Sequence, residues 1–323
     1  MLKKLKSSLD DYAKNIVLVF TGTTVMNFFN LFFQLLIAHK LTAADFAAFN
    51  SLLALFAIFS SPLVTLQLAV TKYSCDFHAQ NQISKLKFFL SDLLKKSLLL
   101  AGATFFLFLS LSNYLVNALK IPSLFCAYIV SALIALSWIV PVLAGGIQGL
   151  ELFHWYSCST VVSGILKLIL GFIFIAFGYN IAGALGALLI ATVVGLFIFY
   201  YPLRQFIVLG LKKEDINYKE ILRYIFPVGA TSLCFMALVS FDMVLVKSYF
   251  SPQDAGFYSL AQMLGKIFLF LPLAVSIVMF PRISSLNAKN MQTFPTLSRS
   301  LRYILILCFS TFIIYNFNLW LGL

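Results

Sequence analysis

The sequence predicts an all-α polytopic membrane protein with about nine transmembrane helices, and three observations lead to this fold class. Apolar residues make up 61% of the 323 positions and charged residues only 11%, against about 45–50% and about 25% in soluble domains. The apolar residues form runs of the length that crosses a bilayer. Lysine and arginine gather in alternate connections between these runs. This composition excludes a soluble enzyme, a nucleic-acid-binding domain, a disordered chain and a disulfide-stapled secreted module.

The apolar runs define the expected spans in order. They cover residues 16–38, 46–71, 97–117, 121–144, 156–178, 181–201, 225–246, 256–280 and 302–322. The first run is too long for a signal peptide and lacks a cleavage site after it, so we expect it to remain as a span. Pro62, Pro141 and Pro272 lie in or at the ends of even-numbered spans, where we expect kinks or helix ends.

The distribution of positive charge predicts the orientation. With the N-terminus in the cytoplasm, 18 of the 23 Lys and Arg residues lie on the cytoplasmic side, and the opposite side holds only Lys40, Lys120 and Lys247. This bias follows the positive-inside rule and explains the net charge of +12 without nucleic acid. Within the second basic connection, the segment 85–96 is expected to lie on anionic headgroups as an amphipathic helix.

An internal repeat predicts the domain organisation. Thr42 and Asp45 match Ser251 and Asp254 at an offset of 209 residues, and the following Phe, Ser and Leu recur at an offset of 208. The alternative is that two apolar hairpins agree by chance. A repeat of this length contains six spans, and parallel six-helix halves are a transporter architecture. We therefore expect one complete six-helix lobe plus three helices of a second lobe, in a chain shortened at its C-terminus.

The expected parts follow from this repeat. They are a cytoplasmic tail at 1–15, a six-helix lobe at 16–203, a basic cytoplasmic linker at 204–224 and a partial lobe at 225–323.

Four segments resemble the polysaccharide-biosynthesis flippases, the O-antigen exporter branch of the multidrug/oligosaccharidyl-lipid/polysaccharide superfamily. These segments are 41–73, 146–153, 226–245 and 255–282. The resemblance implies two lobes around a central cavity in the bacterial inner (plasma) membrane, with the N-terminus in the cytoplasm. It also implies a lipid-linked anionic oligosaccharide, carried on undecaprenyl pyrophosphate, as the substrate. Whether H⁺ or Na⁺ is a coupling ion stays open.

Two lysines within spans are the first candidates for substrate binding, because an ionisable group at this depth is costly. Lys167 is near the middle of the fifth span and would attract pyrophosphate, or else pair with a buried carboxylate. Lys266 follows Gln262 by one turn in the eighth span. Asp242, near the end of the seventh span, would pair with Lys266 as a gate or proton-linked switch, or else be merely interfacial.

Uncharged polar residues on the first span are the second set of candidates. Asn27, Asn30 and Gln34 follow Thr23 on one helical face. They would bind sugar hydroxyls in a cavity, or else form hydrogen bonds between helices.

Motifs for catalysis are missing from the sequence. It has no nucleophile elbow, phosphate loop, zinc spacing or paired carboxylates, so we expect no enzyme activity, catalytic residue, metal or cofactor. The alternatives are a multidrug/cation antiporter of the same superfamily, an inactive truncated remnant and, less favoured, an integral membrane transferase. Two lysines at mid-depth favour an anionic headgroup over a cationic drug.

Overall fold

The fold was analysed in a computed structural model that describes residues 2–208, 214–216 and 218–265, with isolated positions between 294 and 313. The chain divides into two compact units, Met1–Phe257 and Tyr258–Leu323. The ninth expected span, most of the eighth, Lys266 and Pro272 lie outside the described residues.

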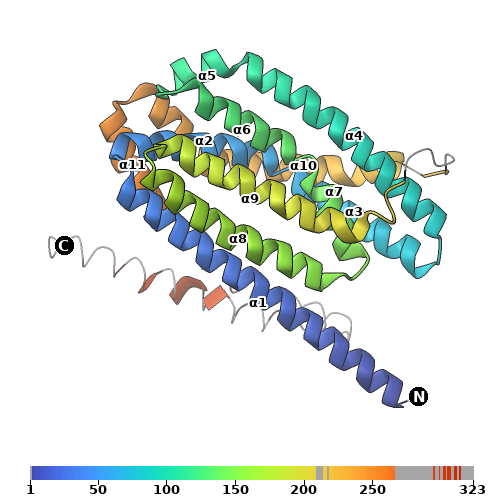
Figure 1. The fold of residues 1–323 in the computed structure, drawn as a ribbon. Coiled ribbons are helices and arrows are strands. Elements are labelled where there is room, and N and C mark those ends of the chain that lie inside the picture. The colour runs from blue at the N-terminus through green and yellow to red at the C-terminus, as the bar shows by residue number, and fades with distance from the viewer. Residues whose placement is uncertain are drawn as a thin grey trace. The chain divides into compact units, whose positions relative to one another are not determined.

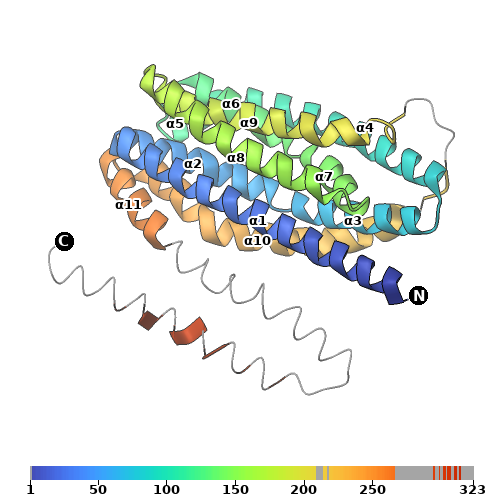
Figure 2. The same cartoon turned by 60° about the horizontal axis from the view of Figure 1, so that its bottom comes forward.

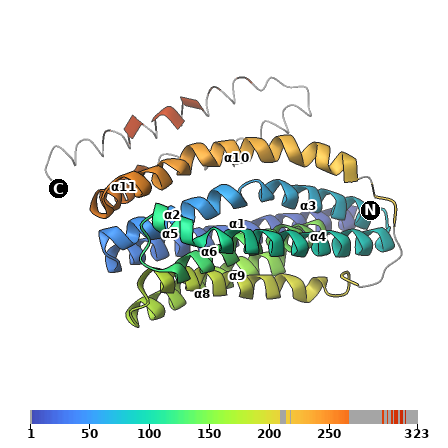
Figure 3. The same cartoon turned by 90° about the horizontal axis from the view of Figure 1, so that it is seen from above.

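The described residues are almost entirely helical and contain no strand. The helices are α1 (Leu2–Lys40), α2 (Ala43–Ser60), α3 (Leu63–Ala79), α4 (Ile83–Ser110), α5 (Ser112–Ala118), α6 (Leu124–Leu136), α7 (Val140–Gly149), α8 (Phe153–Ala176), α9 (Asn180–Leu203), α10 (Tyr218–Tyr249) and α11 (Pro252–Gly265). Within the first unit, α1, α8, α9, α6 and α4 lie side by side in that order (Figure 1). Helix α10 runs along α2 and α3 (Figure 3).

Seven helical segments among the described residues are long and apolar enough to cross a membrane. They are Thr21–Lys40, Ala43–Ser60, Ile83–Ser110, Leu124–Gly149, Phe153–Ala176, Asn180–Leu203 and Tyr218–Tyr249. Each overlaps one of the first seven expected spans, so the all-α polytopic membrane fold is confirmed.

Two of the expected spans, 46–71 and 121–144, are broken near their prolines, as expected. Helix α2 ends at Ser60 and α3 begins at Leu63, with Pro62 between them. Helix α7 begins at Val140 with Pro141 in its first turn. Proline has no N–H to donate and tolerates the first turn of a helix, so each span continues as a second helix after the break.

The expected headgroup segment at 85–96 is packed against protein instead. Leu86, Phe89 and Leu90 are fully buried in a cluster formed with α3 and α7. The ring of Phe89 lies 5.6 Å from the Phe77 ring, centre to centre. The apolar side of this segment is therefore covered by neighbouring helices, which the amphipathic pattern alone does not distinguish from a lipid surface.

The two matched turns of the repeat have the same local geometry. The Thr42 hydroxyl accepts a hydrogen bond from the Asp45 amide at 3.2 Å, at the start of α2. The Ser251 hydroxyl accepts one from the Asp254 amide at the same distance, at the start of α11. A side-chain oxygen that caps the first turn satisfies one of its free N–H groups. This shared cap supports the repeat, while the division into lobes stays a prediction.

Candidate functional site

Lys167 of α8 is the centre of the candidate site. Its ammonium group donates a hydrogen bond to the side-chain oxygen of Asn30 on α1 and lies 5.1 Å from the centre of the Phe33 ring. The residue is 14 positions after Phe153, the first residue of α8, which places it about 21 Å along the helix. The ammonium is therefore deep in the span and is contacted by two side chains of α1, which runs beside α8 (Figure 2).

Glycines on α8 make the room for these contacts. A Cβ atom at Gly171 would lie only 2.5 Å from Cε2 of Phe33, and one at Gly164 would lie 3.4 Å from Cβ of Phe29. The two glycines are seven residues apart, about two helical turns, so they face the same neighbour. Helix α1 can thus approach closely, and the Phe33 ring fits beside Lys167.

The charge of Lys167 is not neutralised by any described carboxylate. The ion pair found in the described part of the chain joins Lys96 and Asp92 on α4, at 2.7 Å. Asn30 is a neutral amide, and an aromatic face offers a cation only a weak partner, worth about 0.5–2 kcal/mol. Within the described residues, pairing with a buried carboxylate therefore does not account for Lys167.

The polar residues of α1 do not act as one row. Asn30 contacts Lys167, whereas the Gln34 amide donates to the side-chain oxygen of Asn50 on α2 at 2.9 Å. Asn27 is exposed. Gln34 thus forms a hydrogen bond between helices, which is one of the two alternatives predicted for these residues, while a binding role for Asn27 and Asn30 stays a prediction.

Helix α8 also carries polar residues that face away from α1. The Ser159 hydroxyl donates to the Gly195 carbonyl at 3.0 Å, and the Ser163 hydroxyl donates to the Ala191 carbonyl at 3.1 Å. These bonds join α8 to the backbone of α9. They contribute to the packing of helices rather than to a site.

The candidate residues on the later helices lie only partly within the residues that the structure describes. The Asp242 carboxylate, on α10, accepts a hydrogen bond from the Met243 amide at 2.7 Å. Gln262 lies in α11. Lys266 is outside the described residues, so its predicted pairing with Asp242 stays a prediction.

A second lysine, which is buried, was not singled out by the sequence. Lys247, in the last turn of α10, is only 2% exposed and lies within electrostatic reach of Asp45 and Lys120. The Lys120 ammonium donates to the Phe250 carbonyl at 3.0 Å. Lys120 and Lys247 are two of the three basic residues that the sequence places on the side opposite the cytoplasm. Basic residues are scarce on that side, and this scarcity is the sequence signal that could have identified Lys247 and Lys120.

Phe33 and Gly171 were also missed at the sequence level. Phe33 follows Asn30 by three residues, and Gly171 follows Lys167 by four. Both spacings place neighbours on one helical face. This signal is weak in a chain with 35 phenylalanines and 16 glycines.

Comparisons with known proteins agree with this architecture. The chain is similar to a multidrug resistance MATE family transporter of the MOP superfamily in an inward-facing conformation, with a TM-score of 0.73, 16% identity and coverage of 90% of this chain and 68% of that one. An outward-facing structure of such a transporter gives a TM-score of 0.61, with 16% identity and coverage of 93% and 69%. A MATE structure in the straight conformation gives 0.64, with 16% identity and coverage of 94% and 70%.

The match to a family model is more specific than these likenesses, which at such identity show the fold alone. No curated protein matches the chain. The family model for polysaccharide biosynthesis proteins matches residues 12–287, most of the sequence. The chain therefore belongs to the polysaccharide biosynthesis protein family and has a multi-pass, MATE-like fold.

Proposed function

We propose that the protein is a flippase that moves a lipid-linked anionic oligosaccharide, carried on undecaprenyl pyrophosphate, across the bacterial inner membrane. Its N-terminus is in the cytoplasm, and its helical lobes alternate between access from one leaflet and access from the other. The substrate has a charged pyrophosphate, a polar sugar and a hydrocarbon tail. Its carrier needs a cation and hydrogen-bonding groups at a depth where bulk water is scarce.

The observation that carries this proposal is the ammonium of Lys167. A charged group inside a span costs about 2.5–3.5 kcal/mol on insertion scales, and Lys167 has no described carboxylate to offset that cost. Asn30 and Phe33 hold the ammonium in place but, because both are neutral, they do not neutralise its charge. A pyrophosphate that reaches Lys167 would form charge-assisted hydrogen bonds, which are about twice as strong as neutral ones.

The other candidates take supporting roles in the proposal. Asn27 and Asn30 present amides that bind sugar hydroxyls, and Gln34 is reassigned to the contact between α1 and α2 because of its bond to Asn50. Lys266 and Gln262 contribute a second polar surface from the later helices. Asp242 serves as a gate or as the site of a coupling ion.

A cation antiporter is the main alternative, since the structures that share this fold include multidrug transporters. Such a protein binds positively charged drugs, which calls for buried carboxylates. An unneutralised ammonium at the site would repel a cation instead. The charge of Lys167 therefore favours an anionic substrate.

The test replaces Lys167 in a bacterial strain that lacks its own polysaccharide flippase. Lys167→Ala is expected to lower surface glycan by about tenfold or more, the change that corresponds to about 1.4 kcal/mol, with unchanged protein in the membrane. Lys40→Ala, which removes an exposed lysine at the end of α1, is the matched control and keeps normal export.

Normal export by Lys167→Ala would reject Lys167 as a substrate contact. Lack of export by the unaltered chain, despite normal insertion, would favour the inactive remnant. Efflux of a cationic drug without glycan export would favour the antiporter.

A further inference from the structure

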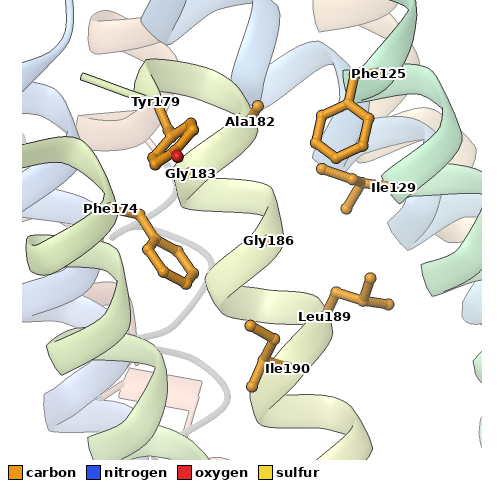
Figure 4. Close-up of a pocket in the computed structure, with 9 residues that line it drawn as sticks. All are labelled: Phe125, Ile129, Phe174, Tyr179, Ala182, Gly183, Gly186, Leu189 and Ile190. Carbon is orange, nitrogen blue, oxygen red and sulfur yellow. The ribbon is translucent and has the colours of Figure 1, made fainter. Parts of the chain in front are cut away.

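A groove with a volume of about 340 Å³ lies between α6, α8 and α9. Figure 4 shows Phe125 and Ile129 of α6 on one side, Phe174 and Tyr179 on the other, and the start of α9 between them. Among the side-chain atoms of its lining residues, the Tyr179 hydroxyl is the one polar group. A groove with this lining offers almost nothing to water or to a polar ligand, so its ligand must be a hydrocarbon.

Two glycines on α9 form the floor of the groove and differ in their surroundings. A Cβ atom at Gly183 would lie 2.8 Å from Cβ of Phe174, so this glycine is needed for the packing of α8 on α9. A Cβ atom at Gly186 would meet nothing closer than 3.9 Å. The space over Gly186 is therefore open, and a larger side chain there would fill the groove without a clash at its base.

The length of the groove matches one leaflet of a bilayer. Its lining on α9 extends from Tyr179, just before the helix, to Ile190, which is about 16 Å at 1.5 Å per residue. The hydrocarbon core of a bilayer is about 30 Å thick, so one leaflet contributes about half of it. The groove thus begins where the span Asn180–Leu203 begins and extends over about the depth of one leaflet.

Exposed phenylalanines accompany the helices that form the groove. Phe172 of α8, Phe177 just after that helix and Phe197 of α9 are 54%, 77% and 69% exposed, as expected for side chains that contact acyl chains. Tyr179, which is 63% exposed, lies at the end of the groove where α9 begins. Tyrosine favours the interface between hydrocarbon and headgroups, where its ring and hydroxyl are both solvated.

We propose that the groove binds one acyl chain of a membrane phospholipid from the leaflet at the Tyr179 end. The volume is about twice that of an engineered cavity of about 150 Å³ that holds a benzene ring, so it takes a segment of about a dozen carbons. The chain lies on the Gly186 floor between α6 and α8, with its headgroup beyond Tyr179. This site is separate from Lys167 and does not depend on the transported substrate.

The test uses liposomes that contain phosphatidylglycerol with a photoactivatable diazirine in its acyl chain. After irradiation, the labelled positions of the full chain are mapped by mass spectrometry. Ile129, Leu189 and Ile190 are expected to be labelled more strongly than Phe106, an exposed residue of α4 outside the groove. Gly186→Leu is expected to lower that labelling by about tenfold, because its side chain takes the space of the bound methylene groups.

Gly102→Leu is the matched control, since Gly102 is also a helical glycine and has no atom within 4 Å of its Cβ position. It is expected to leave the labelling of the groove unchanged. The proposal is overturned if the groove residues are labelled no more than Phe106, or if Gly186→Leu has no effect in a folded protein. Disulfide-linked dimers of a Phe125→Cys variant would likewise overturn it, because they would make a second copy of the chain the occupant. If Gly186→Leu does not fold, the labelling pattern of the unaltered protein decides.

Discussion

Lys167 and Lys247 are both ammonium groups within spans, but their surroundings differ. Lys167 is held by the neutral amide of Asn30 and the ring of Phe33. Lys247 is almost completely buried at the end of α10, within electrostatic reach of the ammonium of Lys120 and, with a smaller effect, of the carboxylate of Asp45. The carboxylate of Asp45 offsets part of the charge of Lys247, whereas no described carboxylate offsets that of Lys167, whose charge is therefore available to a ligand. Burial alone therefore does not single out the lysine proposed to bind substrate.

The largest expected effect on export comes from moving the positive charge of Lys167 from α8 to the neighbouring position on α1. The double variant Asn30→Lys with Lys167→Asn exchanges the two groups that form the hydrogen bond between α1 and α8. If the site needs a positive charge at this place, the exchange is expected to restore export that Lys167→Asn alone loses. Surface glycan in the flippase-deficient strain measures the outcome.

The double variant also has a built-in control, because Asn30→Lys alone places two ammonium groups side by side. Repulsion between them is expected to lower both export and the amount of folded protein. No recovery in a well-folded double variant would show that the position of Lys167, rather than its charge, is what matters.

A smaller effect, on stability rather than export, is expected at Lys247. Lys247→Met is expected to lower the free energy of unfolding by about 1–3 kcal/mol, in the range of substitutions that disrupt a buried interaction. Export per folded molecule should stay normal. Thermal unfolding in detergent measures the change.

Asp45→Asn provides the second arm of this experiment. If Asp45 balances the charge of Lys247, the two substitutions together should cost less than the sum of each alone. Additive effects would show that the two groups are not coupled, and the contrast between the two lysines would lose its basis.

Much of this architecture follows from local rules. The length of each apolar run fixes the spans, Pro62 and Pro141 fix the breaks, and Thr42 with Asp45 fixes a helix start. These features depend on residues close together in the sequence. The depth of Lys167 follows from the same rules.

Contacts between helices could not be predicted in this way. The sequence does not say which helix faces which, so it left open whether Gln34 lines a cavity or bonds to another helix. It also predicted that the segment with Leu86 and Phe89 lies on headgroups, whereas both residues are in the core. Burial of Lys247 depends likewise on how α10 packs along α2. Tertiary packing decides each of these cases.

The most direct test of the central claim measures the binding of an isoprenyl pyrophosphate to the purified chain in detergent. The account predicts that Lys167→Ala weakens this binding by about tenfold, the loss of about 1.4 kcal/mol, while Lys247→Met leaves it unchanged. Equal affinities for Lys167→Ala and the unaltered protein, or an equal loss in both variants, would contradict it.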